Sequence, residues 1–238
     1  MSVRLGPRDM WALLWLSQMG GAPMDVVALL LGTSETNAYR VVARWRHAGK
    51  LIEESVRPVP GRSWVVPNAA TASMLLGFTV PKWMPTPMYA AHETMVARVR
   101  LALVGTEFED SWISERVLRH RNGFRTRPGE SMPHLHDAHY TDDQGLLQAV
   151  EVELTRKGSA AARETMQAAY SAAHAAGADV LVYYCADADV RSRVVAAAGA
   201  LTPVPDGPEV RAQDLTKLFD SRATPFRRGL SAAGGAAS

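Results

Sequence analysis

The stretch SETNAYRVVARWRHAGK, residues 34–50, decides the first half of the fold. One apolar stripe recurs in it at helical spacing: Ala38, Val41, Val42 and Trp45. Ser34 is a favourable N-cap because its hydroxyl accepts a free backbone N–H, and Gly49 suits the left-handed end of a helix. The pattern predicts a helix over residues 35–48 with one side buried and the other exposed.

The opposite side of this predicted helix carries long hydrogen-bonding side chains, which we call the recognition face: Asn37, Arg40, Arg44 and His47. Arginine pairs with guanine edges and asparagine with adenine edges in the major groove of DNA. Three neighbours flank the face and are candidates for phosphate contacts: Thr36, Tyr39 and Arg46. The alternatives are a solvated helix face and a module that binds protein instead.

Further elements are predicted around this helix: helices over residues 9–19, 24–31 and 68–76, and a β-hairpin with strands at 51–57 and 63–66. Arg57 and Arg62 lie near the tip of the hairpin, where a wing contacts DNA. Between residues 33 and 67 six basic residues face three acidic ones, which is a local excess of positive charge. This order is typical of a winged helix-turn-helix, which we predict over residues 1–78.

The rest of the chain is predicted to form a second domain over residues 91–201. A proline-rich linker at 79–90 precedes it, because proline interrupts a helix. The predicted elements are a helix at 92–104, strands at 112–121, 133–140 and 146–155, a helix at 158–176, a strand at 179–185 and a helix at 188–198. The remainder is interpreted as a C-terminal extension, 202–228, and a disordered tail, 229–238.

Helix, three-strand meander, helix and strand is the core order of the PD-(D/E)xK nuclease fold. The predicted fold class is therefore α+β, an N-terminal winged helix-turn-helix followed by an α/β restriction-endonuclease-like domain. Asp137 ends the stretch PHLHD, and Glu151 and Glu153 share one face of the strand VEVELTRK. If the connecting turn centres near Gln144, Asp137 lies opposite Glu151. Clustered carboxylates suit Mg²⁺ or Mn²⁺, which activates a water molecule.

The candidate catalytic residues are Asp137, Glu151, Glu153, Lys157 and Glu115, with Asp137 and Glu151 as metal ligands. Glu153 stands where the nuclease motif has its lysine. Lys157 reaches the site only if the strand ends early and the chain bends. The domain is therefore interpreted either as a metal-dependent endonuclease or nickase, or as a degenerate nuclease fold that needs no cofactor.

Two further clusters accompany these carboxylates. Five arginines between residues 116 and 127, Arg119 and Arg121 among them, indicate a second phosphate-binding surface or a solvated hairpin tip. Three histidines surround Asp137, and a zinc cluster is a minor alternative for them: His134, His136 and His139. Their spacing does not match that of binuclear hydrolases.

The chain resembles the replication-relaxation proteins of plasmids and integrative elements in high-GC bacteria. The resemblance rests on the winged helix, on PHLHD (PHLPD in that family), on VEVELTRK and on Tyr170 in the following helix, and it extends to about Ala200. It implies a double-stranded DNA-binding role in the replication or transfer of a mobile element, or in its regulation. His136 replaces the proline of the family motif and leaves Asp137 in place.

Composition limits the remaining classes. Cys185 is the single cysteine, so no disulfide framework forms and a reducing, cytoplasmic setting is expected, on the nucleoid or a plasmid. No apolar stretch approaches the roughly 20 residues of a membrane span. We expect double-stranded DNA as the partner, a homodimer, no membrane and no small-molecule substrate. A protein-interaction module in a replication or transfer complex is the third hypothesis.

Overall fold

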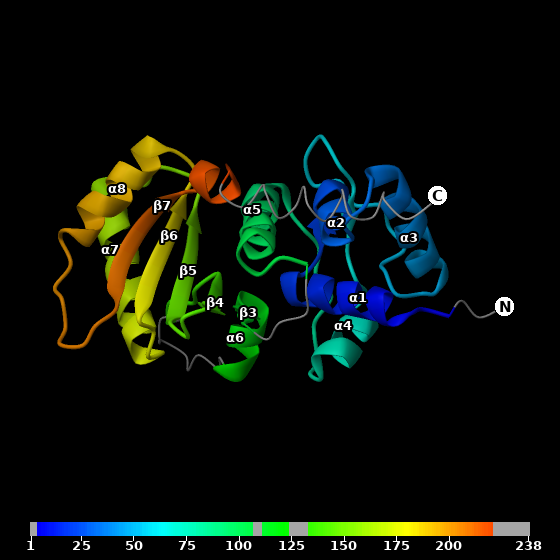
Figure 1. Ribbon diagram of the computed structural model, residues 1–238, viewed down its shortest axis with the longest axis horizontal. Helices are drawn as coiled ribbons and strands as arrows, with labels where there is room; N and C mark the ends of the chain where they lie inside the picture. The colour runs from blue at the N-terminus through cyan, green and yellow to red at the C-terminus, as the bar shows by residue number, and fades with distance from the viewer. Residues whose placement is uncertain (1–3, 107–110, 124–132, 221–238) are drawn as a thin grey trace, which may run out of the picture. The chain divides into compact units, whose positions relative to one another are not determined.

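The computed structural model describes residues 4–106, 111–123 and 133–220, and Figure 1 draws it. These residues divide into two compact units, 4–106 in the first and the remainder in the second. The fold is α+β, as predicted, and it contains a five-stranded mixed sheet. In the parts of the chain described, no helix is long and apolar enough to cross a membrane. The predicted tail at 229–238 lies outside the described residues.

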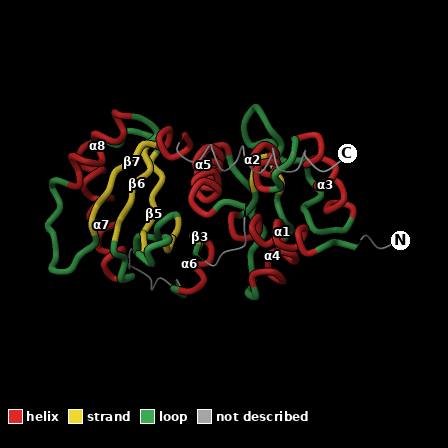
Figure 2. The backbone as a smooth tube through the Cα atoms, in the orientation of Figure 1, coloured by secondary structure: helices red, strands yellow, loops and turns green. Residues whose placement is uncertain are grey.

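The first unit is mainly helical with one short two-stranded sheet (Figure 2). Its elements are α1 (Pro7–Met19), β1 (Ala22–Pro23), α2 (Met24–Leu30), α3 (Glu35–His47), β2 (Trp64–Val65), α4 (Ala69–Leu76) and α5 (Pro87–Val104). The four helices predicted before residue 78 are confirmed, each within about two residues at its ends. β1 and β2 pair antiparallel, with Ala22 opposite Val65.

The predicted hairpin after α3 is much shorter than its sequence pattern suggests. Residues 51–57 form no regular strand and are joined to the return segment by isolated bridges, such as that between Val56 and Trp64. The strand prediction at 51–57 is therefore wrong in extent. Pro58, Pro60 and Pro67 lack the backbone N–H that would extend the ladder.

Helix α5 contacts α2 and β1 and belongs to the first unit. Arg98 forms an ion pair with Asp25 at 2.5 Å, and the guanidinium of Arg100 lies 5.0 Å from the centre of the Trp15 ring. The sequence pattern assigned this helix to the start of the second domain, whereas the division between the units falls after it.

The second unit is a five-stranded sheet with two helices packed on one face. Its elements are β3 (Trp112–Ser114), α6 (Glu115–Arg121), β4 (Ala138–Thr141), β5 (Leu147–Glu153), α7 (Ser159–Ala175), β6 (Val180–Cys185), α8 (Ala188–Ala198) and β7 (Glu209–Asp214). The strand order is β3-β4-β5-β6-β7, antiparallel up to β5 and parallel from there. α7 and α8 cover one face (Figure 1), and β6 is buried along its whole length, with Cys185 in the core as predicted.

The prediction of one strand over residues 112–121 is wrong beyond Ser114. Ser114 is extended (φ −70°, ψ 159°), and helix α6 starts directly after it. Glu115 in the first turn and the basic residues of the last turn suit the two ends of the helix dipole. Alternation of apolar and polar residues over so short a stretch does not separate a strand from a helix.

The strand predicted over 133–140 is also partly wrong. Only Ala138–Thr141 is strand, and residues 133–137 have no regular structure. Strand β7 was not predicted, since Glu209–Asp214 falls in the stretch interpreted as a C-terminal extension. Strands β5 and β6 and helices α7 and α8 are confirmed.

Candidate functional site

The outer side of α3 is the first candidate site. Ala38, Val42 and Trp45 are buried and Val41 is half-buried, so the predicted apolar stripe faces the interior of the unit. The residues of this helix predicted to contact DNA are exposed: Thr36, Asn37, Tyr39, Arg40, Arg44, Arg46 and His47. The helix therefore presents the recognition face and its flanks to solvent.

Both ends of α3 are fixed as the sequence predicted. The hydroxyl of Ser34 accepts a hydrogen bond from the backbone N–H of Asn37 at 3.3 Å. Gly49 has a φ of 66°, in the left-handed region that favours glycine, and turns the chain out of the helix. Such an N-cap stabilises a helix by about 1 kcal/mol. These ends, with the buried stripe, set the direction of the exposed side chains.

Arg44 is bonded to Asp9 of α1, although its side chain keeps 46% of its surface exposed. One carboxylate oxygen of Asp9 accepts from Arg44 at 2.5 Å and from the indole N–H of Trp45 at 2.8 Å. The other accepts from the backbone N–H of Gly6 at 2.9 Å. Burial alone raises the pKa of Asp9, but these hydrogen bonds hold that pKa below its ordinary value of 3.8. One arginine of the recognition face thus ties α1 to α3.

The other arginines near α3 are placed differently. Arg62 makes a bidentate ion pair with Glu35, in which Nη2–Oε1 and Nε–Oε2 are both 3.0 Å. Arg40 donates to the side-chain oxygen of Asn37 at 3.3 Å on the exposed side of the helix. Arg57 is exposed in the segment between α3 and β2. Glu35 therefore neutralises one of the two arginines predicted for the wing.

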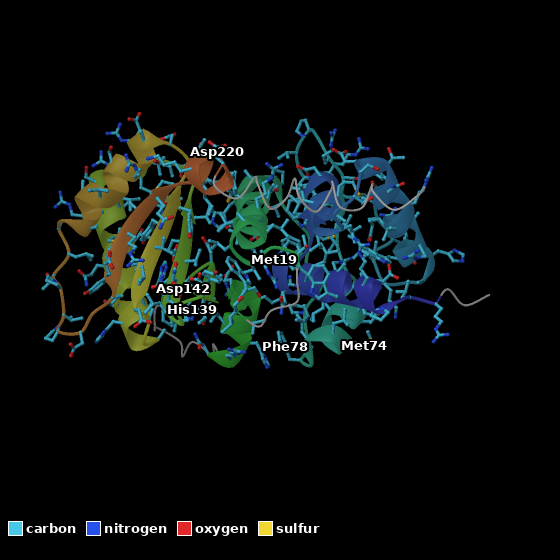
Figure 3. The ribbon with its side chains drawn as sticks, viewed as in Figure 1. Met19, Met74, Phe78, His139, Asp142 and Asp220 are labelled. Atoms are coloured by element: carbon cyan, nitrogen blue, oxygen red, sulfur yellow. The ribbon has the colours of Figure 1, made fainter. Side chains whose placement is uncertain are left out.

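A second candidate site is organised by the turn between β4 and β5. Asp142, just beyond the end of β4 (Figure 3), accepts from the backbone N–H groups of Gln144 at 2.9 Å and Leu146 at 3.0 Å. The register of the two strands centres this turn on Gln144, as the sequence predicted. Continued by one residue before β4, the same register places Asp137 opposite Glu151.

Asp137, which directly precedes β4, is tied to the backbone of β5 and of α6. Its carboxylate accepts from the N–H of Val152 at 2.7 Å, one residue beyond Glu151 on β5. Its carbonyl oxygen accepts from the N–H of Glu115 at 3.0 Å, at the start of α6. These bonds hold the irregular segment before β4 against two elements.

Histidine side chains from that segment converge on Glu151. The Nε2 atom of His134 lies 2.7 Å from Oε1 of Glu151. His136 contacts the carbonyl oxygen of Ala169 in α7 through Nε2 at 3.0 Å, and its Nδ1 lies 3.3 Å from Nε2 of His139. Among the described residues, His134, His136 and Glu151 form a group with the spacing to hold a metal ion, their donor atoms all lying within 4.8 Å of one another.

This donor set departs from the oxygen site predicted for Mg²⁺ or Mn²⁺. Glu151 belongs to it, but Asp137 does not, and one oxygen of Asp137 is engaged by a backbone N–H. Two imidazole nitrogens take the place of further carboxylates. Mg²⁺ prefers oxygen ligands in near-ideal octahedral geometry, so the group does not fit it.

Burial controls the protonation of this cluster. Desolvation raises the pKa of Glu151 to about 7, against the opposing hydrogen bond from His134. For His134, burial lowers the pKa, but the hydrogen bond and charge of Glu151 raise it overall. Burial lowers the pKa of His136 to about 4, so this imidazole is neutral near pH 7. Its Nε2–H therefore donates to the carbonyl of Ala169, and Nδ1 carries the lone pair.

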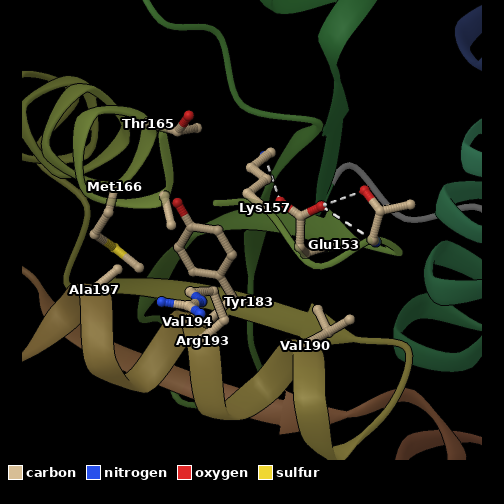
Figure 4. A pocket seen from close by; sticks show the side chains of 11 residues that line it. Glu153, Lys157, Thr165, Met166, Tyr183, Val190, Arg193, Val194 and Ala197 are labelled. Atoms are coloured by element: carbon tan, nitrogen blue, oxygen red, sulfur yellow. Dashed lines mark hydrogen bonds and ion pairs between the residues drawn. The ribbon is translucent and has the colours of Figure 1, made fainter. Parts of the chain in front are cut away.

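Lys157 returns toward the sheet because β5 ends at Glu153 and the chain bends at Thr155. The ammonium of Lys157 forms an ion pair with the carboxylate of Glu153 (Figure 4). The early strand end and the bend that the sequence analysis required for Lys157 are both present. This pair borders a pocket between α7, α8 and the sheet, lined also by Thr165, Met166, Tyr183, Arg193 and Val194.

Tyr183 is a residue that the sequence analysis missed. It lies opposite Glu151 in the parallel β5–β6 register and is 3% exposed. Its hydroxyl is buried and has no hydrogen-bond partner among the described residues. Burial, and then the charge of Glu151, raises the pKa of Tyr183. The turn that fixed the β4–β5 register has no counterpart here, because a helix separates β5 from β6.

The predicted residues on α6 do not join the cluster. Glu115 forms an ion pair with Arg119 one turn along the same helix, so its carboxylate contacts α6 itself and not Glu151. Arg121 is exposed at the end of α6. Arg125 and Arg127, which belonged to the predicted phosphate-binding surface, lie outside the described residues.

Comparison of the chain with family models, with curated proteins and with solved structures gives no match.

Proposed function

We propose that this chain is a sequence-specific double-stranded DNA-binding protein, with α3 as its recognition helix. The observation that carries the proposal is the exposed side of α3. It presents amide, guanidinium and imidazole groups from a helix whose other side is buried and whose ends are capped. A helix of this kind fits the major groove, where such groups pair with base edges.

The order of elements supports a winged helix-turn-helix for the first unit. α1, β1, α2 and α3 follow one another, and the chain then returns through a bridged segment to β2, which pairs with β1. In this arrangement Arg57 and Arg62 lie on the segment that would form the wing. Between residues 33 and 67 six basic residues outnumber three acidic ones, and this net positive charge attracts the phosphates of DNA.

The proposed setting is the DNA of a plasmid or integrative element. It rests on the resemblance of PHLHD and VEVELTRK to replication-relaxation proteins. A homodimer would pair two copies of α3 on two half-sites and so multiply specificity. The second unit would then serve for dimerisation or for additional phosphate contacts, with Arg119 and Arg121 on α6 as the candidates. Light scattering with and without a selected duplex measures the stoichiometry.

The test is a selection of duplexes from a random pool, followed by fluorescence anisotropy between 50 and 200 mM salt. We expect the double variant Asn37→Ala, Arg40→Ala to bind the selected duplex at least about tenfold more weakly, since a bidentate base contact is worth about 1–3 kcal/mol. Arg46→Ala should weaken binding to selected and unselected duplexes alike and reduce the salt slope by about 1.

Arg163→Ala is the matched control, because it removes the same charge from an exposed position on α7 in the second unit. It should leave the affinity for DNA within about twofold of the wild type. Equal affinity of the α3 variants and the wild type for the selected duplex would refute the assignment of α3.

A metal-dependent endonuclease is the second candidate function. It is favoured by Asp137 lying opposite Glu151 when the β4–β5 register is continued by one residue, by the ion pair of Lys157 with Glu153, and by the β4, β5, α7, β6 order, which the PD-(D/E)xK fold shares. Supercoiled plasmid incubated with the protein and Mg²⁺, Mn²⁺ or Zn²⁺ tests it, beside the variant Asp137→Asn, Glu151→Gln. Cutting by the wild type alone would establish the nuclease. If the plasmid stays uncut with every ion, the endonuclease is excluded and the DNA-binding protein without nuclease activity is retained.

A further inference from the structure

We infer that the second unit binds a transition-metal ion of the zinc class through His134, His136 and Glu151. This site is separate from the proposed recognition helix, and it differs in donor set from the magnesium site expected of the nuclease fold. Its support comes from the spacing of the donors, the orientation of one imidazole and the burial of the group.

The spacing of the donor atoms suits one ion. The three ligand atoms lie within 4.8 Å of one another, and His134 Nε2 is 2.7 Å from Glu151 Oε1. Tetrahedral zinc with bonds of about 2.0–2.1 Å holds its ligands about 3.3 Å apart. The imidazole of His134 and the carboxylate therefore need to separate by about half an ångström, and the donor of His136, which lies within 4.8 Å of both, needs to approach the ion.

The orientation of His136 is that of a metal-ligating histidine. Its Nε2–H donates to the backbone carbonyl of Ala169 at 3.0 Å, which fixes the tautomer and leaves the Nδ1 lone pair on the other side of the ring. Metal-bound histidines commonly use their second nitrogen in this way, which holds the ring in place before the ion arrives. His139 contacts that Nδ1 at 3.3 Å but is not within reach of all three donors.

Burial is graded across the group. His136 is 2% exposed, whereas the side chains of His134 and Glu151 keep 18% and 14% of their surface. A carboxylate so far removed from water is stabilised by a nearby cation. The two partly exposed donors leave one side of the group open to water. Three protein ligands with an open fourth position is the pattern of a catalytic rather than a closed structural zinc site.

The donor chemistry selects the class of ion. Imidazole nitrogen suits zinc, copper, iron and nickel, whereas calcium and magnesium take oxygen ligands. Two imidazoles and one carboxylate therefore favour Zn²⁺ over Mg²⁺. Glu151 lies on β5 between β4 and β6, and His136 is fixed to α7, so the ligands are held by separate elements before binding.

The experiment uses the untagged full-length chain, stripped with a chelator and dialysed. Zn²⁺ titration by calorimetry should give one site with a Kd of micromolar or below, unaffected by 5 mM Mg²⁺. Co²⁺ should produce the visible absorption of a low-symmetry site. His134→Gln and Glu151→Gln, which preserve size, should each weaken Zn²⁺ binding at least a hundredfold and abolish the Co²⁺ spectrum.

His174→Gln is the matched control, since it removes an exposed imidazole in the last turn of α7 in the same unit, and it should bind Zn²⁺ within about threefold of the wild type. Circular dichroism establishes that each variant is folded. Absence of a one-to-one Zn²⁺ site in the wild type, or equal Zn²⁺ binding by the wild type and the folded His134 and Glu151 variants, would overturn the inference. DNA binding by α3 is measured independently, so failure of one proposal leaves the other standing.

Discussion

The two candidate sites use polar side chains in opposite ways. On α3, the groups proposed to contact DNA are exposed, and they follow one another on a single helix. In the second unit, the histidines and Glu151 come from two separated segments and are largely withdrawn from water. An exposed charge costs the fold little and is available to a partner. A buried charge must be satisfied within the fold before it can serve a ligand.

From this difference we expect substitutions to fall into two groups, those that alter DNA binding and those that lower the free energy of unfolding. Changes on the surface of α3, apart from Arg44, which is bonded to Asp9, should alter binding and leave the free energy of unfolding nearly unchanged. Changes at buried polar or closely packed positions should lower that free energy, whichever unit they lie in. Three substitutions test this rule, in order of decreasing expected effect.

Asp9→Asn probes the buried carboxylate of the first unit and should lower the free energy of unfolding by about 2–3 kcal/mol at pH 7, because its hydrogen bonds would no longer be made to a charged group. Asp9 holds Arg44 and Trp45 together, and its carboxylate charge would be lost. Because the folded-state pKa of Asp9 lies below 3.8, its contribution is complete above that pH and disappears as the pH falls through the folded-state pKa. Urea unfolding at several pH values measures both effects.

Asp25→Asn is the control for Asp9, because its ion pair with Arg98 keeps 27% of the Asp25 side chain exposed. It should cost about 1 kcal/mol or less. If the two variants lose the same stability, burial does not govern the effect of these carboxylates and the comparison between the sites fails.

Gly207→Ala tests packing in the second unit. A Cβ at this position would lie 2.1 Å from the hydroxyl oxygen of Tyr170, whose ring is only 5% exposed on α7. We expect a loss of about 2 kcal/mol in thermal or urea unfolding. Gly199→Ala, where the nearest atom is 3.6 Å away, should be nearly neutral. A neutral Gly207→Ala would mean that Tyr170 moves freely in this core.

Glu35→Gln tests the exposed pair beside the recognition face. It should change stability by less than about 0.5 kcal/mol, because Arg62 and Glu35 are both solvent-exposed. DNA affinity should rise about two- to fivefold at low salt, since Arg62 is released and one negative charge is removed. Glu54→Gln, which breaks the exposed pair with Lys82, is the control. An unchanged affinity for the Glu35 variant would exclude Arg62 from the interface.

The features that the sequence predicted are those set by local patterns. The 3.6-residue spacing of Ala38, Val42 and Trp45 predicted which side of α3 is buried. A short turn centred on Gln144 determined the β4–β5 register, and therefore that Asp137 lies opposite Glu151. In both cases neighbours in the chain are neighbours in space, so one period and one turn were sufficient.

The features that the sequence did not predict depend on contacts between distant segments. Asp9 lies 35 residues from Arg44, and nothing near Arg44 in sequence reveals that it is already paired. Tyr183 is brought beside Glu151 by a parallel pairing across a helix. The tautomer of His136 depends on the carbonyl of Ala169, a backbone group that sequence does not mark.

The bond between His136 and Ala169 also has a kinetic consequence. It joins residues 33 positions apart, across the β4–β5 turn and into the crossover helix α7. The β4–β5 hairpin pairs residues no more than 12 positions apart, whereas docking α7 closes a longer loop, and contacts between distant segments form more slowly. We therefore expect the imidazole of His136 to be oriented only late in refolding. The rate of zinc binding during refolding would then report the rate at which α7 docks on the sheet.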